Sequence, residues 1–328
     1  MAVEVPDAMA TALAPRPLLS VVIPVYGSAG SLDELCLRLR ESLEKITPHW
    51  EIVFVDDCSP DGAWAHLERF AQADSRVRCI QLMRNRGQQR AVLCGLGQSE
   101  GDFVVTMDDD LQHRPEEIVR MLEAIESTDV DVVVGRYRAR KHGFIRRAGT
   151  RAVRWLAERT VGIPPTLSLT SFRIMTRDVA HAAARIRHVN PVVGYLLFSV
   201  TPRFLNIDVE HDPRRVGSSN YGIRDLIAYF LCMVMDYSDW PLRAVSSAGV
   251  VLSLGSFAAA AFYLYRWMSG TIHVDGFATI VVLITSLFGC VLIGLGIIGS
   301  YLVRALRQTG PDSLVTIRTH RNGVGRTA

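Results

Sequence analysis

Three consecutive aspartates are the residues of this chain best suited to hold a metal ion. Asp108, Asp109 and Asp110 follow the apolar run Phe103–Met107 and precede Gln112. If the backbone is extended there, the carboxylates of Asp108 and Asp110 project to one side and repel each other unless a cation lies between them. Hard oxygen ligands suit Mg²⁺ or Mn²⁺, which proteins commonly share with substrate phosphates. An isolated Asp-x-Asp is more often a solvated acidic turn, but the apolar run before this one favours the metal site.

A second acidic pair, Asp56 and Asp57, follows the apolar run Glu51–Val55. A carboxylate at the end of a strand can accept hydrogen bonds from a nucleotide base or ribose, and Asp56 is our candidate for that role. Asp57 and Ser59 compete with a structural role, because Asp and Ser also favour turns and helix caps.

A basic stretch from Arg136 to Arg154 contains no acidic residue. Guanidinium groups bind phosphate bidentately, and a basic surface beside a membrane also attracts anionic lipid headgroups. Arg136 and Arg147 are the candidate phosphate ligands, while several of the other side chains would form a solvated face.

Short apolar runs alternate with amphipathic segments over the first part of the chain. Runs of this kind, continuous in Val and Ile, indicate a parallel sheet covered by helices on both faces. In such sheets ligands bind beyond the carboxyl ends of the strands, which is where both acidic groups lie. Ser31 and Glu34 fit a capping box, and Pro115 suits a first helical turn. The expected strands are Leu18–Tyr26, Glu51–Val55, Val77–Met83, Phe103–Met107 and Val130–Val134, and the expected helices are Ser31–Ile46, Gly62–Ala73, Gln88–Gln98 and Pro115–Ser127.

Two long segments without charge, about 244–265 and 277–303, are each long enough to cross ~30 Å of hydrocarbon. Arginines flank them on the side of the two chain ends, so the positive-inside rule places both termini in the cytosol and 266–276 outside. We therefore expect a flexible tail (1–17), a catalytic domain (18–210), a loop and juxtamembrane amphipathic helix (211–243), two spans within 244–304, and a cytosolic basic tail (305–328).

Composition excludes some classes of protein. Hydrophobic residues make up 49% of the chain and the mean hydropathy is +0.19, mostly because of the two charge-free segments. The net charge of +3 is too small to indicate nucleic-acid binding. The six cysteines have no zinc or Cys-x-x-Cys spacing, which indicates reduced structural thiols. A Gly-x-Gly-x-x-Gly match at 294–299 lies inside an apolar segment, so we reject it as a dinucleotide site.

In these residues the chain resembles the family 2 glycosyltransferases of the GT-A fold, in particular the polyprenyl-phosphate branch. That branch includes dolichol-phosphate mannose synthases and bacterial undecaprenyl-phosphate glucose and aminoarabinose transferases. The resemblance covers about residues 19–303. It rests on the order and spacing of Val-Val-Ile-Pro-Val-Tyr (21–26), Asp-Asp-Cys-Ser (56–59), Arg-Asn-Arg-Gly-Gln-Gln (84–89), Met-Asp-Asp-Asp-Leu-Gln-His-Arg-Pro-Glu-Glu (107–117), Ser-Phe-Arg-Ile-Met (171–175), Arg-Arg-Val-Gly-Ser-Ser-Asn-Tyr (214–221) and Pro-Leu-Arg (241–243).

The resemblance implies an inverting, metal-dependent transfer of a sugar from a nucleotide diphosphate to a polyprenyl phosphate at the inner membrane, by an enzyme that is often a tetramer. It also implies roles for individual residues. The implied set is Asp108, Asp110 and Gln112 for Mg²⁺ or Mn²⁺; Pro24, Tyr26, Asp56, Asp57 and Asp109 for the nucleotide; Arg136 and Arg147 for catalysis at the phosphates; and Arg214 and Ser219 for the acceptor phosphate.

The chain departs from the family pattern at several positions. Gly27-Ser28 replace the usual Asn-Glu, and Asn220 replaces a phosphate-binding Lys. Ser171 stands where many relatives have an acid, so we assign it no catalysis, and Ser300 replaces a Glu of the second span. The sequence does not select the sugar, and it favours uracil as the base only by analogy. A processive polysaccharide synthase and a nucleotide-sugar-binding scaffold or sensor without turnover are the alternatives.

Overall fold

The computed structural model describes residues 18–137, 162–164, 166–188, 190–210, 212 and 316–322, with residue 158 and scattered positions between 247 and 305. The expected N-terminal tail lies outside these residues, as do nearly all of 211–243 and most positions of the two expected spans. In the part of the chain that is described, no helix is both long and apolar enough to cross a membrane.

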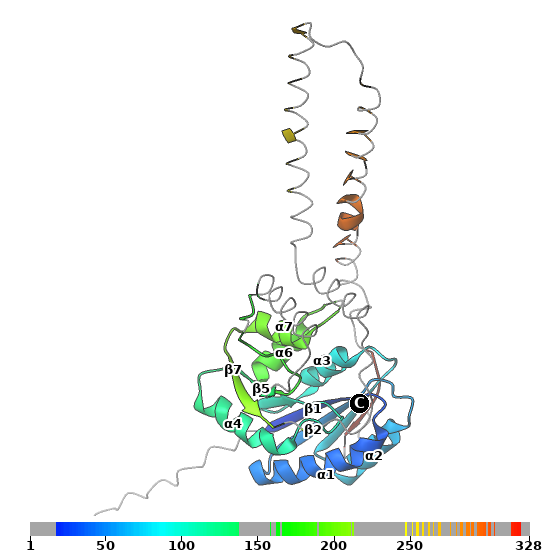
Figure 1. Cartoon of the computed structure of the whole chain (residues 1–328). Coiled ribbons are helices and arrows are strands. Elements are labelled where there is room, and N and C mark those ends of the chain that lie inside the picture. The colour runs from blue at the N-terminus through cyan, green and yellow to red at the C-terminus, as the bar shows by residue number, and fades with distance from the viewer. Residues whose placement is uncertain are drawn as a thin grey trace, which may run out of the picture.

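The core of the fold is an eight-stranded sheet in the order β7-β5-β6-β4-β1-β2-β3-β8 (Figure 1). Strands β1 to β4 run parallel, as do β5 and β7, which confirms the expected parallel arrangement. Strand β6 lies antiparallel between β4 and β5, and β8 lies antiparallel at the edge beside β3. The strands are β1 (Leu19–Val25), β2 (Trp50–Asp56), β3 (Val77–Leu82), β4 (Phe103–Thr106), β5 (Val132–Tyr137), β6 (Arg173–Thr176), β7 (Phe204–Val209) and β8 (Ile317–Asn322).

Helices cover both faces of this sheet (Figure 1). Side chains alternate along each strand, so Val21 and Ile23 of β1 enter the core under α1, α2 and α4, whereas Val22 enters the core under α3, α6 and α7. The helices are α1 (Ala29–Ile46), α2 (Ala63–Ala73), α3 (Gln88–Gln98), the 3₁₀ turn η1 (Pro115–Glu117), α4 (Ile118–Ser127), α6 (Arg177–Arg185) and α7 (Val193–Val200).

The five expected strands and four expected helices all form, with ends within three residues of their predicted positions. The expected capping box is wrong, because α1 begins at Ala29 and Ser31 lies inside it. The Ser31 hydroxyl donates instead to the carbonyls of Ser28 and Asp109, at 2.9 and 2.8 Å. Ser31 therefore ties the start of α1 to the acidic loop.

Strands β6, β7 and β8 were not expected from the sequence. Strand β8 belongs to the segment we assign to a basic tail, yet it pairs with β3 from Arg78↔Asn322 to Leu82↔Ile317. A chain segment that follows the two apolar segments thus completes the sheet of the N-terminal domain.

Candidate active site

The acidic groups meet at one edge of the sheet. Strands β1, β2 and β4 are parallel neighbours, with Val25 in register with Asp56 and Val22 in register with Thr106. The backbone N–H of Tyr26 donates to Asp109 at 3.2 Å, which joins the loop after β1 to the loop after β4. The expectation that both acidic groups lie beyond the carboxyl ends of the strands is therefore confirmed.

Asp108 is oriented by three neighbours. Its two carboxylate oxygens accept hydrogen bonds of 2.6 Å from the Gln88 amide and of 2.6 Å from the Ser171 hydroxyl. Its backbone N–H donates to Nδ1 of His113 at 2.9 Å. Because Nδ1 accepts, the neutral His113 ring carries its proton on Nε2, which lies 3.6 Å from Asp108 Oδ2. Phe172 stacks on the His113 ring and fixes its plane.

Asp110 is oriented by the turn that follows it. Its carboxylate accepts the backbone N–H of Gln112 at 3.2 Å and the Gln112 side-chain amide at 2.6 Å. Leu111 between them has φ +60°, in the left-handed region that a branched side chain rarely adopts. This strained residue reverses the backbone so that Gln112 faces Asp110.

The donor set fits a hard divalent cation that is shared with a substrate. Asp108 and Asp110 would offer carboxylate oxygens to such an ion, and Gln112 would offer its amide oxygen. Among the described residues, no group of three or more His, Cys, Asp or Glu side chains could hold a metal by itself. Mg²⁺ typically binds through one or two carboxylates plus substrate phosphates and water, so two carboxylates at the mouth of the sheet match that mode.

Asp109 faces away from its two neighbours. Its carboxylate accepts hydrogen bonds from the Tyr26 backbone and from the Ser28 hydroxyl. Burial raises the pKa of Asp109 to about 6, although these hydrogen bonds oppose the shift. In the structure Asp109 anchors the loop after β1, and its expected contact with a nucleotide stays a prediction.

Asp56 and Asp57 also use their carboxylates within the fold. Asp56 is fully buried and accepts the backbone N–H of Ser59 at 3.0 Å and the Gln81 amide at 3.1 Å. Asp57 accepts two backbone N–H groups, from Arg86 at 2.6 Å and from Gly87 at 2.7 Å. Burial raises the pKa of Asp57 above its ordinary value. Asp57 therefore shapes the loop that leads into α3.

The remaining predicted nucleotide residues differ in exposure. Pro24 is buried in β1. The pairing of β1 with β4 ends at Val22 and Thr106, so the missing N–H of Pro24 removes no hydrogen bond between these two strands. Tyr26 is 54% exposed, and its ring is free of the core. Tyr26 is thus the member of this set whose side chain can stack on a base.

Of the predicted phosphate-binding arginines, the structure describes Arg136. Arg136 lies on β5, and its guanidinium donates to Asp208 of β7 at 2.8 Å, with both side chains well exposed. This ion pair raises the pKa of Arg136. Arg147, Arg214 and Ser219 lie outside the described residues, so their expected roles stay predictions.

Sequence reasoning missed two side chains of the site, Gln88 and Arg173. Gln88 is the first residue of α3 and belongs to the noted 84–89 motif, which was the available signal. Arg173 is buried in β6, and its Nε and Nη1 have no hydrogen-bond partner. Burial lowers the pKa of Arg173 to about 10, and the charge of nearby Asp108 opposes the shift. The sequence signal for Arg173 was a charged residue within the otherwise apolar run Phe-Arg-Ile-Met.

The mostly parallel sheet with helices on both faces is an α/β fold of the GT-A type. Glucosyl-3-phosphoglycerate synthase from Mycobacterium tuberculosis, in complex with Mn²⁺, UDP and glucosyl-3-phosphoglycerate, has this fold. The structures align with a TM-score of 0.50 over 67% of this chain and 78% of that chain, at 14% identity.

The family model described as glycosyl transferase family 2 matches residues 20–190. The chain is 34% identical to an undecaprenyl-phosphate 4-deoxy-4-formamido-L-arabinose transferase from Edwardsiella ictaluri, over 87% of this chain and 89% of the relative. A transferase of the same name from Proteus mirabilis is 30% identical, over 87% and 88% of the two chains. The chain belongs to glycosyltransferase family 2 and is a glycosyltransferase.

Proposed function

We propose that the protein transfers a sugar from a nucleotide diphosphate to undecaprenyl phosphate at the cytosolic face of the inner membrane. The observation that carries this proposal is the match to undecaprenyl-phosphate transferases over nearly the whole of both chains, at 30–34% identity. The oriented carboxylates at the sheet edge supply the chemistry that such a transfer needs.

The reaction requires little proton transfer. An oxygen of the lipid phosphate attacks the anomeric carbon while the bond from that carbon to the nucleoside diphosphate breaks, so the configuration inverts. A phosphate oxygen is already anionic at neutral pH and needs no strong general base. Most of the acceleration then comes from positioning and from neutralising charge on the departing diphosphate.

Asp108, Asp110 and Gln112 are the residues that would hold Mg²⁺ or Mn²⁺. Such an ion, when bound, neutralises the diphosphate oxygens. Gln88, Ser171 and His113 keep Asp108 in one orientation, and Asp57 shapes the loop ahead of α3. We propose UDP as the first carrier to test, because the mycobacterial synthase holds UDP and Mn²⁺ in the same fold.

Membrane attachment is supported by two features of the described residues. Large apolar side chains between 251 and 302, among them Leu254, Phe288 and Leu295, are more than half exposed. Strand β8 follows this region and pairs with β3. A chain that leaves the domain after β7 and returns to it at β8 crosses a bilayer an even number of times, which supports two spans with both termini cytosolic.

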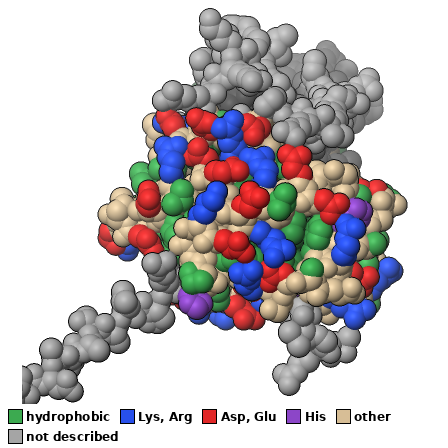
Figure 2. Space-filling model, turned by 90° about the horizontal axis from the view of Figure 1, so that it is seen from below, with side chains coloured by type: hydrophobic (Ala, Val, Ile, Leu, Met, Phe, Trp, Pro, Cys, Tyr) green, Lys and Arg blue, Asp and Glu red, His purple; other side chains and the backbone are tan. Residues whose placement is uncertain are grey.

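The surface seen from below gives no support for a nucleic-acid partner. Acidic and basic side chains alternate over this face in Figure 2. Ion pairs also join charged side chains of α1 and α2, as Arg69 pairs with Asp33 at 2.8 Å. A face with both signs interspersed lacks the basic stripe that would follow a phosphate backbone.

The test is transfer of radiolabelled sugar from a panel of UDP- and GDP-sugars to undecaprenyl phosphate. Detergent-purified wild type is compared with Asp110→Asn, which keeps the shape of the side chain and removes its charge, with Mn²⁺, Mg²⁺ or a chelator present. We expect one donor to label the lipid in a metal-dependent way, with at least a hundredfold loss in the variant.

The other outcomes decide between the alternatives. If the protein binds a nucleotide sugar but labels no lipid, it would be a scaffold or sensor instead of an enzyme. Labelled material that grows in length with time would indicate a processive polysaccharide synthase.

A further inference from the structure

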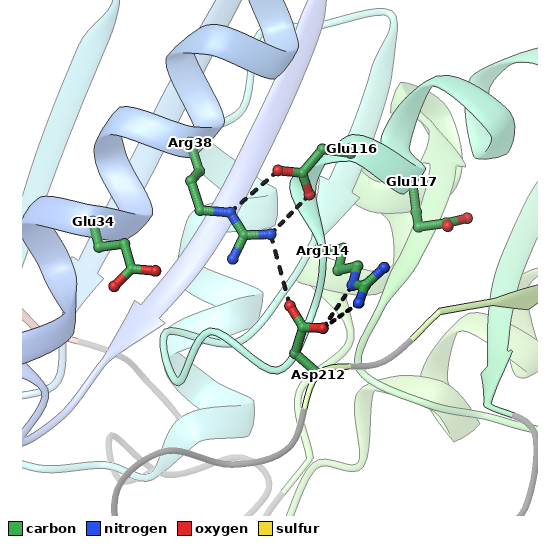
Figure 3. A pocket seen from close by; sticks show the side chains of 6 residues that line it. All are labelled: Glu34, Arg38, Arg114, Glu116, Glu117 and Asp212. Carbon is green, nitrogen blue, oxygen red and sulfur yellow. Dashed lines mark hydrogen bonds and ion pairs between the residues drawn. The ribbon is translucent and has the colours of Figure 1, made fainter.

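A cluster of charged side chains joins three segments that are far apart in the sequence (Figure 3). Arg38 comes from α1, Arg114 from the turn before η1, and Asp212 from the chain after β7. Arg114 Nε donates to Asp212 Oδ1 at 2.7 Å, and Arg38 Nη2 lies 3.8 Å from Asp212 Oδ2. We call these three residues the Asp212 clasp. They line a cavity of about 460 Å³ together with Glu34, Glu116 and Glu117.

The cavity is poorly suited to bind an anion. Each of its two arginines already has carboxylate partners. Arg38 forms a bidentate ion pair with Glu116, with hydrogen bonds of 3.2 and 2.9 Å, and Arg114 also contacts Glu210. Four acids and two arginines line the cavity, which leaves a negative balance that repels phosphate. The role of the cluster must therefore be sought in the segments that it holds.

One of those segments is the loop that carries the candidate metal ligands. The backbone N–H of Asp212 donates to the carbonyl of Gln112 at 3.0 Å. Gln112 in turn donates its side-chain amide to Asp110 at 2.6 Å. Arg114 comes two residues after Gln112, so the clasp fixes the far end of the same loop. A continuous path of hydrogen bonds thus connects Asp212 to Asp110.

The other segment is the chain that leads to the predicted acceptor residues. Arg214 follows Asp212 by two residues. The bonds of Asp212 to Gln112 and Arg114 therefore fix, beside the metal loop, the described residue that precedes the predicted acceptor residues in the sequence.

We propose that Arg114 and Asp212 are positioning residues that hold the chain after β7, which leads in the sequence to the predicted acceptor residues, against the loop of the candidate metal ligands, and so set the approach of the lipid phosphate to the donor. This inference rests on the proposed function. Neither residue contacts the reacting atoms. A displacement of about 1 Å in a positioning element can cost about a hundredfold in rate, so the clasp acts through the geometry of its neighbours.

The experiment measures initial transfer rates against undecaprenyl phosphate and against the sugar donor. The variants are Asp212→Asn, Arg114→Gln, their double variant and Arg114→Lys. Calorimetry with UDP and Mn²⁺ reports the donor side without turnover. Asp33→Asn is the matched control, because it breaks an α1 ion pair with Arg69 that does not touch Asp212.

We expect Asp212→Asn and Arg114→Gln each to raise the KM for undecaprenyl phosphate about tenfold. The KM for the donor and the affinity for UDP with Mn²⁺ should stay within twofold of wild type. The double variant should be no worse than either single variant, because one interaction is lost in all three. Arg114→Lys keeps the charge and should recover part of the acceptor KM, and Asp33→Asn should match wild type.

Two results would overturn the inference without touching the proposed function. The first is transfer by wild type with an unchanged acceptor KM in both single variants. The second is an equal change in the donor KM, the acceptor KM and the melting temperature, which would show a purely structural role. Absence of transfer by wild type with every donor would overturn the proposed function and this inference together.

Discussion

At the scale of single residues, three adjacent aspartates have three different environments. Strand β4 ends at Thr106 and residues 109–111 form a bend, so the backbone of this bend directs Asp109 to the loop after β1, whereas Asp108 bonds to Gln88 and Asp110 to Gln112. The sequence predicted that Asp108 and Asp110 project to one side of an extended chain, and the bend after β4 does not meet that condition. It could not predict that Gln88 and Ser171 hold Asp108, because those contacts join segments separated by 20 and 63 residues.

Arg173 allows a prediction in which stability and activity change in opposite directions. Two of its buried nitrogens have no acceptor, and an unsatisfied buried donor costs about 1–3 kcal/mol. We predict that Arg173→Met unfolds at the same or a higher temperature than wild type. Sugar transfer should fall at least tenfold, because a positive charge beside Asp108 is lost where the diphosphate gathers negative charge.

Thermal unfolding and initial rates of the purified protein check this prediction. Arg173→Lys serves as the control, since it keeps a cation at the same position and should keep more of the rate. A marked drop in the melting temperature of Arg173→Met would show that the guanidinium is a structural support instead.

At the scale of elements, burial decides what the sequence can predict. Strands β1 and β2 are buried along their whole length and read as apolar runs. Strand β6 has only four residues and starts with Arg173, and β8 reads Ile-Arg-Thr-His-Arg-Asn. Strand β8 lies at the edge of the sheet and is partly exposed, so polar residues are compatible with it and its sequence carries little hydrophobic signal. The clasp was equally hidden, because ion pairs between distant segments leave no local pattern.

Asp74 connects three elements and allows a prediction for the dependence of stability on pH. It closes α2, and its carboxylate contacts Arg40 of α1 at 3.2 Å and Arg76 at 2.8 Å. The hydrogen bond from Arg76 lowers the pKa of Asp74 below its ordinary value of 3.8. A carboxyl whose pKa is lower in the folded state stabilises the fold above its unfolded pKa and loses that contribution as the pH falls.

We therefore predict that Asp74→Asn lowers the free energy of unfolding by about 1 kcal/mol at pH 7. The difference from wild type should shrink as the pH falls below about 4. Melting temperatures of both proteins across that range give the measurement. A difference in melting temperature that stays constant down to low pH would show that the substitution acts through packing instead of charge.

At the scale of the whole molecule, strand β8 attaches the C-terminal part of the chain to the sheet of the N-terminal domain. It follows the apolar region and pairs along β3 through five registered residues, from Arg78 to Leu82. Ile317 packs partly against the core under α3, and Arg321 lies 3.3 Å from Glu68 of α2. Strand β8 thus ties the chain that follows the apolar region to the sheet and to α2.

Removal of β8 tests this role directly. Deleting residues 316–328 exposes the edge of β3 and removes one partly buried isoleucine, for a cost of about 2–3 kcal/mol. In a domain of this size, each 1 kcal/mol shifts the melting temperature by about 2–4 °C, so we predict a fall of roughly 5–10 °C. Deleting only 323–328 spares the strand and should leave the melting temperature unchanged. Equal melting temperatures for both truncated proteins and wild type would show that β8 contributes nothing to the fold, and would remove the structural support for an even number of membrane crossings.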